Sequence, residues 1–205
     1  VLLPTIPMNL PVLLLSIALL PGPAPRLPAL QEEQQKVDER PEVKALLDEI
    51  DPLLKAKGEK DTEAIAVLDK LVQEFPNCGP KDRLAIVKVC SDCFDLKRTK
   101  ELEEGTPDDR LYKTAAVAMG LMGPESVKPL MALIGDKSHR KNQGLQIALT
   151  QSLGKTKSPD AVKLLMSLLK HKDAPMQAAG AEAMAFFSGA PEAPRKLLFG
   201  ELPRT

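Results

Sequence analysis

Three cysteines in the middle of the chain are the residues best suited to covalent chemistry. Cys90 and Cys93 form a C-x-x-C pair, and Cys78 precedes them. A redox pair of this kind usually starts a helix that follows a strand, and no strand pattern precedes this one. A structural zinc site needs four ligands, and both histidines of the chain lie elsewhere. We therefore expect the cysteines to face the core from a packed helix.

The alternative for the cysteines depends on the compartment. In an oxidising compartment, the sequence favours a disulfide from Cys78 to Cys90 or to Cys93, with one thiol left over. A bridge between Cys90 and Cys93 is a further option.

Two short basic stretches each contain one of the two histidines. They follow Leu-rich helical patterns at comparable places, so they would line up along one edge of a stack of repeats. Such a basic edge would suit an acidic protein or a polyanion. The simpler explanation is a pair of solvated turns whose cations complement helix C-termini. The predicted basic edge consists of Lys137, His139, Arg140, Lys141, Lys170, His171 and Lys172.

Acidic residues cluster just before the repeats, at Glu101, Glu103, Glu104 and Asp108-Asp109. Paired carboxylates can transfer protons or bind a metal ion. Here they fall in a linker and at a helix start, where helix capping explains them. The chain also has no Gly-rich phosphate loop and no G-x-S-x-G or H-E-x-x-H motif. We therefore predict no catalytic, cofactor-binding or metal-binding residues.

The composition indicates a helical protein that has no general affinity for nucleic acid. Apolar residues make up 43% of the 205 residues, but aromatic residues only 3%. Leu, Ala, Val, Ile and Met must therefore fill the core, which suits close packing of helices better than strands. Lys plus Arg and Asp plus Glu both number 28, so the net charge gives no reason to expect nucleic acid as a partner.

Residues 1–30 differ from the rest of the chain. They contain one charged residue, Arg26, and an apolar run over residues 10–20 that is followed by alternating prolines. This pattern predicts an export signal or, alternatively, an apolar disordered leader. The run is shorter than the roughly 20 residues that span a bilayer, so no stable transmembrane anchor is expected. The protein would be periplasmic or secreted if the signal is real, and cytoplasmic otherwise.

Helical patterns begin after a polar linker at residues 31–40. Apolar residues recur at helical spacing from Pro41 until a stop at Lys57-Gly58, and two further helices are expected over residues 61–75 and 80–95. Residues 41–105 would thus form N-terminal helices, with a diverged repeat as one reading of them. A charged segment before Pro107 separates them from the rest.

The chain repeats itself over residues 106–205. Three small-residue segments, at 115–123, 146–154 and 181–189, each end in glycine, where a helix can close in the left-handed conformation. A proline followed by an acidic residue then starts another helix at Pro124, Pro159 and Pro191. Neither helix of such a pair can bury its apolar stripe alone, so neighbouring pairs must stack.

The alternation of a small-residue helix, Gly, Pro-Glu-x-Val and a Leu-rich helix resembles the short HEAT-like repeats, including those of phycobilin lyases. The resemblance implies an all-α fold, an α-solenoid of stacked antiparallel helical hairpins with a HEAT/armadillo-like superhelix. Because such repeats serve many proteins as binding surfaces and the sequence shows no catalytic constellation, we expect a non-catalytic scaffold that binds another protein. Two alternatives remain: a lyase-like HEAT-repeat enzyme acting on a bound chromophore, and a degenerate repeat fragment of a larger assembly.

Overall fold

The computed structural model of the chain describes residues 37–96 and 109–188. The first range holds helices α1 (Pro41–Leu54), α2 (Asp61–Glu74) and α3 (Pro80–Asp92), with short 3₁₀ turns η1 (Phe75–Asn77) and η2 (Cys93–Asp95). The second holds α5 (Arg110–Leu121), η3 (Gly123–Ser126), α6 (Val127–Gly135), α7 (Gln143–Lys155), α8 (Pro159–Leu168) and α9 (Ala174–Ala185). The predicted all-α class and the stack of helical hairpins are confirmed for these residues.

Prolines and capping side chains fix where the helices begin. Pro41, Pro80 and Pro159 each open a helix, because proline has the required φ and its missing N–H would have no partner there. The Ser158 hydroxyl accepts a hydrogen bond from the Asp160 N–H. The Asn142 side chain likewise accepts one from the Leu145 N–H at 3.0 Å and so caps α7.

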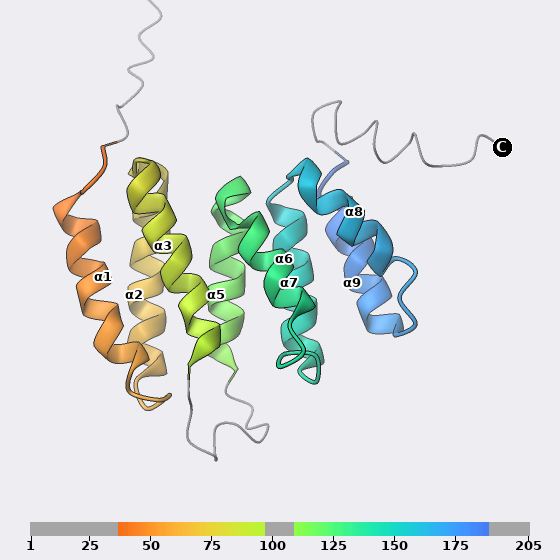
Figure 1. Cartoon of the computed structure of the whole chain (residues 1–205), viewed down its shortest axis with the longest axis horizontal. Coiled ribbons are helices and arrows are strands. Elements are labelled where there is room, and N and C mark those ends of the chain that lie inside the picture. The colour runs from red at the N-terminus through yellow and green to blue at the C-terminus, as the bar shows by residue number, and fades with distance from the viewer. Residues whose placement is uncertain (1–36, 97–108, 189–205) are drawn as a thin grey trace, which may run out of the picture. The chain divides into compact units, whose positions relative to one another are not determined.

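The helices form two layers, which Figure 1 shows as a rear row and a front row. In the first layer α2 packs on α5, α5 on α7, and α7 on α9. In the second layer α3, α6 and α8 cover them, while α1 packs mainly on α2. Each helix therefore buries its apolar stripe against neighbouring helices of its own layer and against the facing layer, as stacked hairpins must.

Small residues let the first-layer helices approach closely. A Cβ atom added to Gly120 would lie 2.9 Å from Cα of Ser152, and one added to Gly154 would lie 2.5 Å from the carbonyl oxygen of Ala183. Real Cβ atoms do not come this close to backbone atoms, so only glycine fits at both contacts. These two glycines therefore set the spacing between α5, α7 and α9.

The predicted left-handed glycine stops are confirmed once and wrong once. Gly123 has a φ of +72° and ends the first small-residue helix as expected. Gly154 instead lies inside α7, which runs on to Lys155, and Lys157 takes the left-handed conformation with a φ of 53°. The close contact of Gly154 with α9 explains why a glycine stands at this position. Gly189 lies outside the described residues, as does the Pro191 start.

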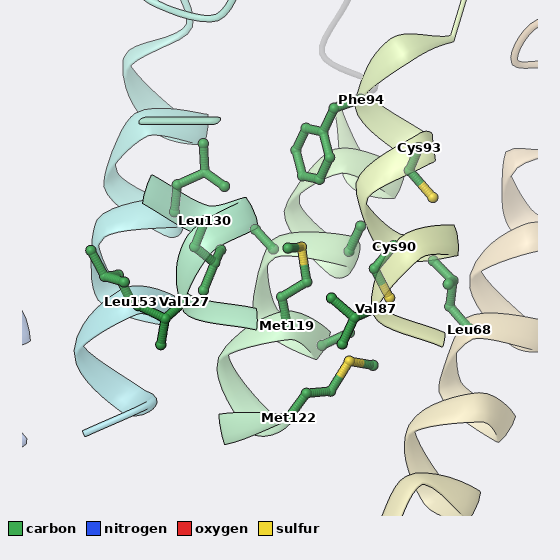
Figure 2. Packing of buried hydrophobic residues seen from close by; sticks show 14 of the residues in the cluster. Leu68, Val87, Cys90, Cys93, Phe94, Met119, Met122, Val127, Leu130 and Leu153 are labelled. Atoms are coloured by element: carbon green, nitrogen blue, oxygen red, sulfur yellow. The ribbon is translucent and has the colours of Figure 1, made fainter. Parts of the chain in front are cut away.

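The core is continuous through both layers. Figure 2 shows Val87 and Cys90 of α3 packed with Met119 of α5, beside Val127 and Leu130 of α6, and all belong to one buried cluster. Leucine, alanine, valine and methionine supply most of its side chains. The predicted aromatic-poor helical core is thus what holds the layers together.

Residues 37–40, the end of the predicted polar linker, dock on the turn between α2 and α3. The Asp82 carboxylate accepts hydrogen bonds from the Glu39 and Arg40 N–H groups at 3.1 and 3.0 Å. The Asp38 carboxylate in turn accepts one from the Lys81 N–H at 2.8 Å. These reciprocal bonds fix the start of α1. Residues 31–36 and the predicted export signal at residues 1–30 lie outside the described residues.

The lengths of the helices have one further consequence. Over the described ranges, no helix combines enough length and apolar character to cross a membrane.

Candidate protein-binding cleft

A cleft of about 860 Å³ lies where the loops of two successive hairpins meet. It is bounded by α6, the loop to α7, the first turn of α7, α8, the loop to α9, and the start of α9. Its apolar wall consists of Met131, Ile134, Leu164, Leu168 and Met176. A cleft of this size with predominantly apolar walls is typical of a ligand-binding site.

The rim of the cleft is basic. Arg140 and Lys141 come from the α6–α7 loop, and His171 and Lys172 come from the α8–α9 loop. The stacking of hairpins thus brings together two pairs of adjacent residues that are 31 positions apart in sequence. We call these four residues the cleft rim. Three carry a permanent positive charge, and the only carboxylate among the lining residues is that of Asp173.

Hydrogen bonds hold the two loops in place. The Gln143 amide donates to the Asp173 carboxylate at 3.0 Å and so joins the start of α7 to the start of α9. The Asp173 N–H donates to Nδ1 of His171 at 3.2 Å, which assigns the proton of a neutral His171 to Nε2. Arg140 donates a long bond, 3.5 Å, to the Gly135 carbonyl at the end of α6. This last contact is the helix-end role that the simpler explanation of the basic edge proposed.

Gln146 is the unusual residue of the cleft. Its side chain lines the cleft while the residue is only 7% exposed. Its Nε2 is buried and has no hydrogen-bond partner among the described residues. Burying an amide N–H without a partner costs about 1–3 kcal/mol. A half-turn of the terminal amide would exchange its nitrogen and oxygen, so this side chain can offer the cleft a donor or an acceptor.

The remaining residues of the predicted basic edge lie elsewhere. His139 packs against two rings, edge-on to Phe94 with centroids 5.7 Å apart and tilted to Tyr112 at 6.2 Å. Lys137 and Lys170 are exposed and do not line the cleft. The residues of the predicted edge therefore lie in different places. Arg140, Lys141, His171 and Lys172 form the cleft rim, whereas His139 belongs to an aromatic cluster that joins η2, α5 and the α6–α7 loop.

The three cysteines are free thiols, and all are fully buried. Burial raises the pKa of the Cys90 thiol strongly, and the neighbouring Cys93 raises it further. Burial also raises the pKa of Cys78, although Arg40 opposes this by hydrogen bonding. The thiols of Cys78 and Cys93 donate to the carbonyls of Glu74 and Val89 at 3.3 Å. Neutral, buried thiols of this kind are poor nucleophiles and poor metal ligands.

Of the predicted acidic clusters, only Asp109 lies in the described part. Its carboxylate accepts a hydrogen bond from the Asn142 amide at 3.0 Å and pairs with Lys113 at 2.8 Å. It thereby links the starts of α5 and α7, although it does not cap α5 through its side chain. Glu101, Glu103, Glu104 and Asp108 lie outside the described residues. Within residues 37–96 and 109–188, no three His, Cys, Asp or Glu side chains are grouped to hold a metal ion.

The sequence does not mark the apolar wall or Gln146 as parts of a site. The wall residues belong to the helical stripes that also fill the core, so their type gives no sign that they border a cleft. A glutamine near the start of a helix is usually exposed to solvent, so its type does not predict burial. The one available signal was that Gln146 falls on the same helix face as Leu149 and Leu153, both of which are buried.

Comparison with known proteins supports the repeat architecture. Residues 97–185 match the family model described as HEAT repeats. The match spans the helices α5 to α9, of which α6 to α9 border the cleft. Neither the curated proteins nor the solved structures contain a significant match to this chain.

Proposed function

We propose that this chain, whose residues 97–185 carry HEAT repeats, is a non-catalytic scaffold that binds another protein through the cleft between its hairpin loops. The observation that carries the proposal is the cleft itself, in which a basic rim surrounds an apolar wall and a buried amide. Stacked helical repeats commonly use their extended surfaces in this way.

The residues of the cleft suit binding better than acid–base or nucleophilic chemistry. The lining residues include no Ser, Thr, Cys or Tyr, and the Asp173 carboxylate already accepts a hydrogen bond from Gln143. Catalysis by these routes needs a nucleophile next to a base or two groups with opposed proton affinities. Among its lining residues, the cleft therefore offers no hydroxyl or thiol nucleophile beside a base. The phycobilin-lyase alternative would also want aromatic residues around a chromophore, and the lining residues contain none beyond His171.

A pull-down with the full chain as bait tests the proposal. The test variant carries Lys141→Glu and Lys172→Glu, which reverse two exposed charges of the cleft rim. The matched control carries Lys44→Glu and Lys70→Glu, two exposed lysines of α1 and α2. Exposed charges of this kind change stability little. We expect a partner protein that is recovered with the native chain and the control but lost with the test variant. Equal recovery with all three baits would assign the binding to another surface.

The export proposal rests on residues 1–30 alone. N-terminal sequencing of the mature protein from the producing cell is its test. A chain that begins after about residue 25 would support cleavage of a signal, and an intact leader in the soluble cytoplasmic fraction would contradict it.

A further inference from the structure

We infer that the ligand of the cleft is a short acidic segment of the partner protein that carries one apolar anchor side chain. This inference rests on the proposed function and specifies the chemistry of its ligand. Three features of the cleft contribute to it: the charge of its rim, its apolar wall and the amide of Gln146.

The charge of the rim selects acidic ligands. Arg140, Lys141 and Lys172 converge from two loops, and the single lining carboxylate, Asp173, accepts a hydrogen bond from Gln143. The starts of α7 and α9 border the same space, but so do the ends of α6 and α8, so the helix termini give it no net charge and the side chains of the rim decide its sign. Aspartate or glutamate side chains of a ligand would therefore find more positive than negative partners, and their attraction would weaken as salt is added.

The apolar wall selects a hydrophobic side chain between those acidic residues. Leu168 and Met176 are largely buried, whereas Met131 and Leu164 are half-buried, so the wall keeps apolar surface open to the cleft. Methionine side chains adapt their shape to different apolar groups. A leucine, isoleucine, methionine or phenylalanine of the ligand would remove this surface from water and serve as the anchor.

Gln146 favours a peptide over a lipid or a nucleic acid. A primary amide can donate to the C=O and accept from the N–H of one residue of an extended chain, so a peptide that reaches the buried amide would satisfy the partnerless Nε2. A fatty acid chain would instead seal the amide under hydrocarbon without a partner. A nucleic acid would lack aromatic side chains to stack its bases, since only His171 among the lining residues has a planar ring.

Selection from a displayed library of random decapeptides against the full chain tests the inference. We expect enrichment of sequences with at least two Asp or Glu residues next to one large apolar residue. Affinity for the most enriched peptide is then measured by fluorescence anisotropy at low and moderate salt. Lys141→Glu with Lys172→Glu should weaken it about tenfold or more, whereas Lys44→Glu with Lys70→Glu should not change it.

A substitution of Gln146 separates a role in binding from a role in folding. Gln146→Met keeps the volume and removes the buried N–H, so we expect weaker peptide binding, about fivefold, with an unchanged or raised thermal midpoint. The matched control is Gln73→Met, at an exposed position of α2, which should leave binding unchanged. A lowered midpoint for Gln146→Met would show that the amide serves the fold, and would overturn its part in recognition.

The outcomes distinguish this inference from the proposed function. Enrichment of basic or neutral peptides, or no enrichment, would overturn the acidic ligand, even if the pull-down recovers a partner that depends on the cleft rim. Equal affinity in the charge-reversed and native chains would also overturn it. If the native chain binds no peptide from the library and recovers no partner in the pull-down, the proposed function is contradicted as well.

Discussion

Replacing Gly154 by alanine should destabilise the protein although alanine is the better helix former. Gly154 lies within α7, where a Cβ atom would come within 2.5 Å of the Ala183 carbonyl oxygen and 2.6 Å of its Cα. Both contacts involve backbone of α9, which cannot turn aside as a flexible side chain would. The methyl group must therefore push α7 and α9 apart.

The expected magnitude follows from two opposing effects. Alanine in a helix interior is favoured over glycine by about 1 kcal/mol. Forcing an extra methyl group into a close-packed contact costs about 1–3 kcal/mol, and a backbone contact places Gly154→Ala at or above the upper end of this range. We therefore expect a net loss of about 2 kcal/mol in the free energy of unfolding, or a fall of about 4–8 °C in the thermal midpoint.

The matched control is Gly135→Ala at the end of α6. A Cβ atom there meets no heavy atom within 4 Å, so only the helix preference remains. This variant should be unchanged or stabilised by up to about 1 kcal/mol. Urea and thermal unfolding of the full chain, followed by circular dichroism at 222 nm, measure both changes.

The relative stabilities of the two variants can contradict the close contact between α7 and α9. If Gly154→Ala is as stable as Gly135→Ala or more so, α7 and α9 do not approach as closely as the structure has them. The account of why glycine stands inside α7 would then fail.

Two further predictions concern the N-terminal helices. Asp82→Asn should lower the free energy of unfolding by about 1–3 kcal/mol, because the buried carboxylate holds two backbone N–H groups before α1; Asp69→Asn, at an exposed site of α2, should change it little in the same urea titration. Raising the pH above the ordinary thiol value of 9.0 should also destabilise the protein. Burial raises the pKa of Cys90, so the folded chain keeps a proton that the unfolded chain loses. The loss due to Cys90 should be about 1.4 kcal/mol per pH unit above the ordinary thiol pKa. Cys90→Ala should remove this share and leave the part due to Cys78, whose pKa burial also raises. An unchanged pH slope in that variant would place the effect on other groups.

The positions of the helices followed from the sequence because local chemistry decides them. Pro41, Pro80 and Pro159 open helices as predicted, and Gly123 closes one. Two positions differ. Pro124 lies in the 3₁₀ turn η3, and α6 begins only at Val127. For Gly154, the local signal and the tertiary role differ. A glycine that ends a helix and a glycine that lets two helices touch look alike in one sequence.

The cleft was predictable only in part. Stacking of repeats places equivalent loops side by side, so the sequence predicted that Arg140, Lys141, His171 and Lys172 lie along one edge. In the structure these four residues line one cleft. The packing of His139 against Phe94 and Tyr112 was not predictable, since it depends on how α3 and η2 pack against the repeats. The partnerless amide of Gln146 was likewise not predictable, because the cleft that it borders forms only where α6, α8 and α9 meet α7.

The α2–α3 pair occupies the place of an earlier repeat. α2 packs on α5 as α5 packs on α7, and α3 lies in the same layer as α6 and α8. The HEAT-repeat match nevertheless begins at residue 97. That α2 and α3 descend from a diverged repeat therefore stays a prediction, since equivalent packing can arise without common ancestry.

The most direct test of the central claim is site-specific photocrosslinking in cells that produce the full chain. A photoreactive amino acid replaces Lys172 at the cleft rim or, as the matched control, Lys88, an exposed residue of α3 away from the cleft. The account predicts a covalent adduct with a second protein from position 172 and not from position 88. Adducts of equal yield from both positions, or from position 88 alone, would contradict the claim that the cleft is where this scaffold binds its partner.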